Sequence, residues 1–130
     1  MIKEGIVGDF ASGGITGYYV DMLKDGLFKK LYDVQCFDLQ AVESTLTDKA
    51  HLMMDASMYG NPYYENGPIV NGLDLVVLGA TEIDTNFNVN VTTDSFGKII
   101  GGSGGHSDTA NGAKITMITT QLIRPQYLLL

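Results

Sequence analysis

The first third of the chain alternates between strand-like and helix-like patterns of apolar residues. Residues 2–10 predict a short strand, and Ser12-Gly13-Gly14 follows as a glycine turn. Apolar residues at 15–23 then recur at spacings of three and four, which predicts a helix that closes at Gly26. This order is the opening of a βα unit. It places Gly13 and Gly14 at the carboxyl end of a strand, where open α/β sheets bind their ligands.

A second strand and a second helix are predicted next. Residues 31–37 form the strand, in which Cys36 is interpreted as a buried small residue. Asp38 stands at the strand's end, where its carboxylate either caps the helix that begins at Leu39 or faces a ligand. The cap is the preferred interpretation. Residues 51–57 predict a third strand. Residues 59–68 predict a loop whose tyrosines either line a pocket or cover the sheet edge.

The second half of the chain predicts the centre of a sheet and a hairpin. Residues 73–80 are the most apolar run, which is typical of a central strand covered by helices on both faces. Its exit places Glu82 and Asp84 at a strand end. Residues 87–100 alternate around a turn and predict an antiparallel hairpin, and residues 114–120 predict a last strand. The fold class is therefore α/β, an open and mostly parallel sheet flanked by helices, in one domain of residues 1–130.

Composition narrows the classes of partner and compartment. The chain has 130 residues, 45% hydrophobic and 18% charged, which is ordinary for a globular protein and argues against disorder. A net charge of −7 without a basic patch argues against a nucleic-acid partner. One cysteine allows no disulfide framework, and neither a membrane span nor a signal sequence is evident, so we expect a cytoplasmic protein. His51 and His106 lack metal-ligand spacing, so no metal site is predicted.

A glycine-rich loop between two apolar runs is the main candidate for a ligand site. Residues 101–108 read Gly-Gly-Ser-Gly-Gly-His-Ser-Asp, and glycines leave backbone N–H groups open to a ligand. Ser107 or Asp108 can cap a short helix over 109–112, which would add further N–H groups. The alternative is a flexible turn that joins two strands.

Several stretches together resemble the citrate lyase alpha chain family, a branch of the CoA-transferase superfamily. The resemblance extends from about Ile6 to Ile123. The stretches that carry it are residues 73–84, 87–91, 102–110 and 112–116, with 12–16 and 34–39 upstream. It implies the open, mostly parallel α/β fold of the CoA-transferases. Family chains are several times longer and contain two related α/β halves, so this chain is expected to be a fragment of the later half.

The resemblance also implies an activity. The family's alpha chain exchanges acetate for citrate on an acyl thioester, giving a citryl thioester and free acetate. A separate beta chain cleaves the citryl group, and a gamma acyl carrier chain bears the thiol on a CoA-derived arm. No cofactor is expected to bind directly, because CoA-type thioesters are substrates, and an oligomer is expected. The acid attacks the thioester directly through a mixed anhydride, so the protein needs positioning groups and an oxyanion site rather than a nucleophile.

Site residues follow from the matched motifs. The candidate catalytic residues are His106, Asp108, Asp38 and Glu82. The candidate substrate-binding or CoA-binding residues are Ser12, Gly13, Gly14, Asn88, Asn90, Gly102, Ser103, Gly104 and Gly105. We expect the N–H groups of the glycine loop to stabilise an oxyanion. His106 is expected to donate to a substrate carboxylate with Asp108 orienting it; the alternative is that His106 bonds to a backbone carbonyl.

Two departures from the family and two rival functions remain. Residues 125–130 do not follow the family after Arg124. Residues 64–67, Tyr-Glu-Asn-Gly, match three letters of the Ser-Glu-Asn-Gly motif that carries a glutamyl nucleophile in related enzymes. They lie too close to the predicted central strand, so the match is interpreted as coincidence. The rivals are a non-catalytic fragment that only assembles, and a transferase for a related acid such as citramalate.

Overall fold

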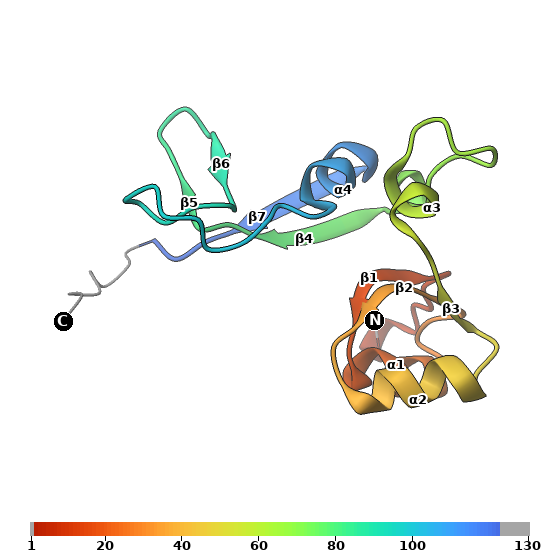
Figure 1. Ribbon diagram of the computed structural model, residues 1–130. Helices are drawn as coiled ribbons and strands as arrows, with labels where there is room; N and C mark the ends of the chain where they lie inside the picture. Colours follow the sequence, from red (N-terminus) through yellow and green to blue (C-terminus); the bar gives the residue numbers. More distant parts are fainter. Residues whose placement is uncertain (1, 123–130) are drawn as a thin grey trace. The chain divides into compact units, whose positions relative to one another are not determined.

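The structure is a computed structural model that describes residues 2–122 (Figure 1). Contacts within the chain divide it into two compact units, residues 1–69 and residues 70–130. The sequence analysis expected one domain of residues 1–130, and whether these two units form one domain stays a prediction. No helix in residues 2–122 is long and apolar enough to cross a membrane. The departures at residues 125–130 lie outside the described residues.

The first unit is a three-stranded parallel sheet with two helices packed on it. Its elements are the 3-10 helix η1 (Ile2–Glu4), β1 (Ala11–Ile15), α1 (Gly17–Lys24), β2 (Leu31–Cys36), α2 (Leu39–Thr47), β3 (His51–Met53) and α3 (Ala56–Gly60). The strand order is β1-β2-β3, with Leu31 paired to Ala11 on one side and His51 on the other. The core lies between the sheet and the helices and is built on Ile15, Val20 and Leu31.

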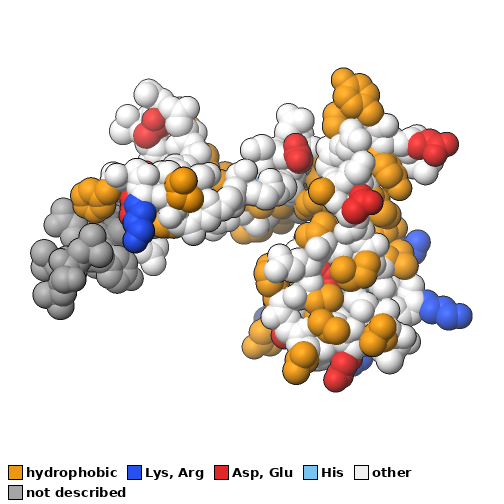
Figure 2. All heavy atoms as spheres, in the orientation of Figure 1, with side chains coloured by type: hydrophobic (Ala, Val, Ile, Leu, Met, Phe, Trp, Pro, Cys, Tyr) orange, Lys and Arg blue, Asp and Glu red, His pale blue; other side chains and the backbone are white. Residues whose placement is uncertain are grey.

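Surface apolar side chains are also common in this unit. Tyr18 on α1 and Leu39 and Leu46 on α2 are largely exposed. Figure 2 shows apolar side chains spread over the face of the unit that carries these two helices.

The first expected strand is wrong, because the extended segment begins nine residues later. Residues 2–4 form η1, and Gly5 has a φ of 63°, which interrupts an extended backbone. The expected glycine turn at 12–14 is part of β1, where the register with β2 shifts between Gly13 and Gly14. These glycines therefore lie in a strand that pairs in parallel with β2, at an irregularity of the register, and not in a turn. The third strand is also shorter than expected, since α3 begins at Ala56.

The second unit is built on a parallel strand pair joined by a crossover helix. Its elements are η2 (Ile69–Gly72, which begins one residue before the unit), β4 (Leu75–Gly79), β5 (Glu82–Ile83), β6 (Val89–Asn90), α4 (His106–Gly112) and β7 (Ile115–Thr119). β4 pairs in parallel with β7, and β5 pairs antiparallel with β6. Gly112 lies against Val70, and a β-carbon there would collide with that side chain.

Two expectations for this unit are corrected. The strand at 73–80 is not covered on both faces, because alternate residues of β4 are exposed. The hairpin near 87–100 is present in a different pairing: β6 pairs with β5, while Thr93 and Ile99 form an isolated antiparallel bridge. The helix expected at 109–112 begins earlier, at His106.

Candidate functional site

The carboxyl end of β4 brings three segments of the second unit together. The backbone N–H of Thr81, just after β4, donates to the Asn90 carbonyl of β6 at 2.7 Å. The His106 ring, at the start of α4, lies 3.0 Å from the Gly79 carbonyl at the last residue of β4. Ligands of open α/β sheets bind outside the carboxyl ends of the strands. This end of β4 is therefore the candidate site.

His106 is anchored to the backbone. Its Nε2 lies 3.0 Å from the carbonyl oxygen of Gly79, and a carbonyl only accepts, so Nε2 is the donor. In the neutral ring Nδ1 is then an acceptor, and it can donate to a carboxylate only in the imidazolium. Of the two roles expected from the sequence, the structure contains the bond to a backbone carbonyl. Donation to a substrate stays a prediction.

Asp108 does not hold the His106 ring in this structure. Both residues lie in α4, and helical positions two apart point to different sides. The helix is capped by Gly105, so the cap expected at Ser107 or Asp108 is wrong. The Asp108 side chain is exposed in the first turn of α4. A catalytic role for Asp108 stays a prediction, without the orienting contact that motivated it.

The glycine loop presents backbone N–H groups. Gly102 and Gly104 are exposed, and Gly104 has a φ of 51°, a conformation that favours glycine. The Ser103 carbonyl accepts from the His106 N–H at 3.0 Å, which fixes the loop to the start of α4. Within residues 2–122, the N–H groups of Gly102, Gly104 and Gly105 have no hydrogen-bond acceptor. They are therefore available to an anionic atom of a ligand.

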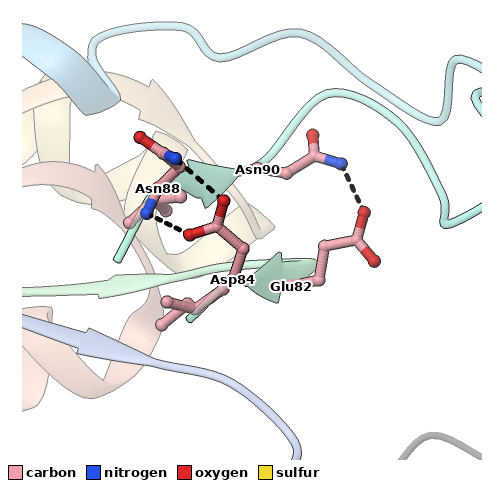
Figure 3. A pocket seen from close by; sticks show the side chains of 6 residues that line it. Glu82, Asp84, Asn88 and Asn90 are labelled. Carbon is pink, nitrogen blue, oxygen red and sulfur yellow. Dashed lines mark hydrogen bonds between the residues drawn. The ribbon is translucent and has the colours of Figure 1, made fainter. Parts of the chain in front are cut away.

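Glu82 and Asn90 face each other across the β5–β6 pair (Figure 3). Asn90 Nδ2 donates to Glu82 Oε1 at 2.9 Å, and Ser95 Oγ donates to Glu82 Oε2 at 2.7 Å. The Asn90 amide is itself fixed by Thr93, whose Oγ1 lies 2.9 Å from Nδ2 and whose N–H donates to Oδ1 at 3.1 Å. The Glu82 carboxylate is thus held in one orientation from both sides.

Asp84 and Asn88 form a second such pair at the tip of the same strands (Figure 3). Asn88 Nδ2 donates to Asp84 Oδ2 at 2.8 Å, and the Asn88 N–H donates to Oδ1 at 2.8 Å. These bonds, the side-chain bond first, hold the pKa of Asp84 below its usual value of 3.8. Both pairs line an open pocket of about 270 Å³ together with Ile83 and Val89. His106 and the glycine loop are not among the residues that line it.

The candidates in the first unit have local structural partners. Asp38 Oδ1 accepts from the Ala41 N–H at 2.8 Å and caps α2, which confirms the preferred interpretation. Its Oδ2 accepts from the Gly17 N–H at 2.6 Å at the start of α1. These bonds, the one from Gly17 first, lower the pKa of Asp38 from 3.8. The Asp38 carboxylate thus accepts a backbone N–H at the start of both α1 and α2.

Gly14, another candidate, packs closely: a β-carbon on Gly14 would collide with the Phe37 ring.

Two more candidates lie in β1. Gly13 has a φ of 121°, which only glycine adopts easily. Ser12 Oγ is buried without a hydrogen-bond partner among the described residues. Whether either residue contacts a substrate or CoA stays a prediction.

The sequence analysis missed a buried polar network around Asp33. Asp33 and His51 are fully buried, with His51 Nε2 3.1 Å from Asp33 Oδ2. Cys36 Sγ donates to the same oxygen at 2.9 Å, and the Gln35 N–H donates to Oδ1 at 2.7 Å. Burial, and after it the Asp33 carboxylate, raises the pKa of the Cys36 thiol to about 11, which makes it a poor nucleophile. The available signal was a carboxylate two positions after Leu31, on the core face of the strand.

Comparisons with known proteins agree with one another. The family model "Citrate lyase, alpha subunit (CitF)" matches residues 1–128. The citrate lyase alpha chains of Haemophilus influenzae and Escherichia coli are 49% and 46% identical over 124 residues, which is 95% of this chain but 25% and 24% of theirs. That of Klebsiella pneumoniae is 45% identical. The chain thus spans about a quarter of the length of the curated relatives it matches.

A solved structure extends the agreement to three dimensions. It is described as the putative alpha subunit of citrate lyase from Streptococcus mutans in complex with citrate. Its similarity has a TM-score of 0.90 and 47% sequence identity, and covers 96% of this chain and 24% of the other. The resemblance seen in the sequence and the α/β fold class are therefore confirmed. This chain belongs to the citrate lyase alpha subunit family.

Proposed function

We propose that this chain supplies part of the site of a citrate transferase, which exchanges acetate for citrate on an acyl thioester. The observation that carries the proposal is the family match over residues 1–128, with a structural relative that is in complex with citrate. The chain's own contribution is the carboxyl end of β4 with its glycine loop. The remaining part of the site is supplied by sequence that corresponds to the unmatched three quarters of the relatives.

The proposed reaction needs no enzyme nucleophile. An oxygen of a citrate carboxylate attacks the carbonyl carbon of the acetyl thioester and expels the thiolate, giving a mixed anhydride of acetate and citrate. The thiolate then attacks the citryl carbonyl of the anhydride and expels acetate. Both steps pass through a tetrahedral oxyanion. Catalysis therefore depends on holding two anionic reactants together and on preorganised donors for the oxyanion.

The second unit contains groups suited to both tasks. The N–H groups of Gly102, Gly104 and Gly105 are available as oxyanion donors, because they have no acceptor within residues 2–122. The His106 imidazolium can donate from Nδ1 to a citrate carboxylate while Nε2 stays on Gly79. The chain's net charge of −7 repels citrate at long range, so such local donors have to carry its binding.

The wider assignment is part of the same proposal. The thioester is that of CoA or of a CoA-derived group on an acyl carrier gamma chain, and a beta chain then cleaves the citryl group. The proposed assembly of these chains is cytoplasmic. Citrate is proposed over citramalate because the Streptococcus mutans relative is described with citrate.

Acyl transfer from an acetyl thioester to citrate tests the proposal. The chain is assayed alone and together with the part of the Escherichia coli alpha chain that the match leaves out. We expect transfer in the mixture only, reduced by about 100-fold or more in Gly104→Val, because valine disfavours the φ of 51° that positions this N–H as an oxyanion donor. We also expect slower transfer in His106→Ala, which lacks the proposed donor to the citrate carboxylate. Gly67→Val is the matched control, because Gly67 also has a positive φ, 74°, but lies in the first unit.

Either of two results would reject the transferase. One is a mixture that forms a folded complex but shows no transfer, which favours a fragment that only assembles. The other is an equal loss in Gly67→Val and Gly104→Val, which shows that strain, and not the glycine loop, causes the loss. Faster transfer to citramalate than to citrate would instead correct the substrate.

A further inference from the structure

Thr109 is a buried polar residue of α4, close behind the glycine loop in the chain. It is 3% exposed, and α4 packs on β4 and β7 (Figure 1). A valine would fill almost the same volume without burying a hydroxyl, which is unfavourable unless the hydroxyl is hydrogen-bonded. Packing alone therefore does not explain a threonine at this position, and the contact of its hydroxyl has to be considered.

The Thr109 hydroxyl donates to the carbonyl of Gly105, the last glycine of the loop. Oγ1 lies 2.6 Å from that oxygen, and the Thr109 N–H donates to it as well at 2.9 Å. A helical threonine can bond in this way to the carbonyl four positions earlier. The N–H of the same peptide unit, that of His106, donates to the Ser103 carbonyl at 3.0 Å. Both ends of the Gly105–His106 peptide unit are thus bonded, which fixes its plane.

The glycine loop has few other contacts that could fix its conformation. In the part of the chain that the structure describes, a β-carbon on Gly102 or Gly104 would meet no heavy atom within 4 Å beyond its chain neighbours. Glycine also has more backbone freedom than any other residue. Gly105, the N-cap of α4, has no side chain with which to cap the helix. The direction of the loop's N–H groups therefore depends on the bonded peptide unit at its end.

We propose that Thr109 is a positioning residue, whose hydroxyl fixes Gly105 and thereby aims the N–H groups of Gly104 and Gly105. The proposal rests on the proposed function, in which these N–H groups stabilise the oxyanion. Preorganised oxyanion donors act mainly in the transition state. Loss of their orientation should therefore slow the chemical step more than it weakens the binding of citrate.

Two pairs of side chains separate the hydroxyl from the shape of the residue. Thr109→Val keeps the shape of threonine and lacks the hydroxyl. Thr109→Ser keeps the hydroxyl and lacks the methyl group, and Thr109→Ala differs from it only by the hydroxyl. The matched control is Thr47→Val, because Thr47 Oγ1 donates to the Glu43 carbonyl, also four positions earlier, at 2.9 Å in α2 of the first unit.

The first readout is the amide spectrum of the whole 130-residue chain, produced with ¹⁵N-labelled glycine. The signals of Gly104 and Gly105 are identified by their loss in Gly104→Ala and Gly105→Ala. We expect both signals to shift or broaden in Thr109→Val and Thr109→Ala. They should stay close to their wild-type positions in Thr109→Ser and Thr47→Val. This readout requires no transferase activity.

The second readout is acyl transfer from acetyl-CoA to citrate. The enzyme is one continuous polypeptide, in which this chain replaces the 124 matched residues of the Escherichia coli alpha chain. We expect Thr109→Val to lower kcat about tenfold, less than the loss of an oxyanion donor, because the Thr109 N–H still holds the Gly105 carbonyl. The KM for citrate should change by less than about twofold, and Thr109→Ser should recover most of kcat.

Three results would overturn the proposal. Unchanged signals of Gly104 and Gly105 in Thr109→Val would show that the hydroxyl does not hold the loop. Equal changes in Thr109→Ser and Thr109→Val would assign the effect to side-chain shape. A higher KM with an unchanged kcat would place Thr109 in citrate binding. A wild type that transfers no acyl group, while its glycine signals respond as expected, would reject the proposed function and leave the positioning of the loop by Thr109 supported.

Discussion

Replacing His51 by alanine tests whether the buried pair with Asp33 stabilises the first unit. Both side chains are fully enclosed, and the ring Nε2 lies 3.1 Å from Asp33 Oδ2. Without the ring, the Asp33 carboxylate keeps the Gln35 N–H at 2.7 Å and the Cys36 thiol at 2.9 Å. A thiol is a weak donor, so one carboxylate oxygen would be left poorly satisfied in a fully buried site.

The magnitude follows from the two limits for such a change. A hydrogen bond to a charged group contributes about 1.5–3 kcal/mol, and leaving a buried charge without its partner costs about 3–5 kcal/mol. Asp33 retains one strong donor, so we expect His51→Ala to lower the free energy of unfolding by about 3 kcal/mol, near the boundary of these ranges. Cys36→Ala removes only the weak donor and should cost less than about 1 kcal/mol.

Urea unfolding followed by circular dichroism measures both effects. The free energy comes from the midpoint and the slope of the transition, and an unchanged slope shows that the same surface is exposed. His106→Ala is the control, because it removes the other histidine from the second unit and should not shift the transition of the first. The reasoning is refuted if His51→Ala costs no more than Cys36→Ala.

Three further predictions concern a cap, a glycine and the thiol. Backbone donors lower the pKa of Asp38 in the folded state. The Asp38 carboxylate therefore stabilises the fold fully above its unfolded-state pKa, and this stabilisation is lost as the pH falls through its folded-state pKa. Asp38→Asn should therefore flatten the acid limb of a circular dichroism titration below about pH 4. Gly14→Ala would place a methyl group into the Phe37 ring and should cost about 1–3 kcal/mol in thermal or urea unfolding, whereas Gly79→Ala, with open space around it, should cost less. The Cys36 thiol has a pKa raised from 9.0 to about 11, so its alkylation by iodoacetamide at pH 8 should be about 100-fold slower in the folded chain than in urea.

Each of these has a result that contradicts it. An acid limb that is equally steep in Asp38→Asn would show that other carboxylates govern acid unfolding. Equal stability of Gly14→Ala and Gly79→Ala would show that the Phe37 ring moves aside freely. Equal alkylation rates in the folded and the unfolded chain would mean that partial burial and the bond to Asp33 do not raise the pKa of the Cys36 thiol.

The sequence predicts those elements whose cause is local. The apolar run at 31–37 became β2, and Asp38 caps α2 because a carboxylate just before a helix finds the free N–H groups there. Gly13 and Gly14 lie in β1, not in a turn, because this segment pairs with β2. Gly13 has a φ of 121° at the register shift, and a pair of glycines in the sequence does not distinguish such an irregular strand from a turn.

The candidate site is predicted only in part for the same reason. A short helix follows the glycine loop as expected, but the bond from His106 to Gly79 joins residues 27 positions apart and follows from the crossover between β4 and β7. The pair of Asp33 and His51 requires the parallel alignment of β2 and β3. Spacing along the sequence cannot supply such contacts, because they depend on which strands become neighbours.

The strand registers also set an order of events during folding. In the first unit, Ala11 pairs with Leu31 and Leu31 with His51, so each contact closes a loop of about 20 residues. In the second unit, Leu75 pairs with Ile115, which closes about twice that length. Contacts that are closer in sequence form faster, and synthesis delivers them first. We therefore expect the three-stranded sheet to form on the ribosome before β7 has been synthesised. During that interval β4 is unpaired, so β4 is the segment to which we expect a chaperone to bind.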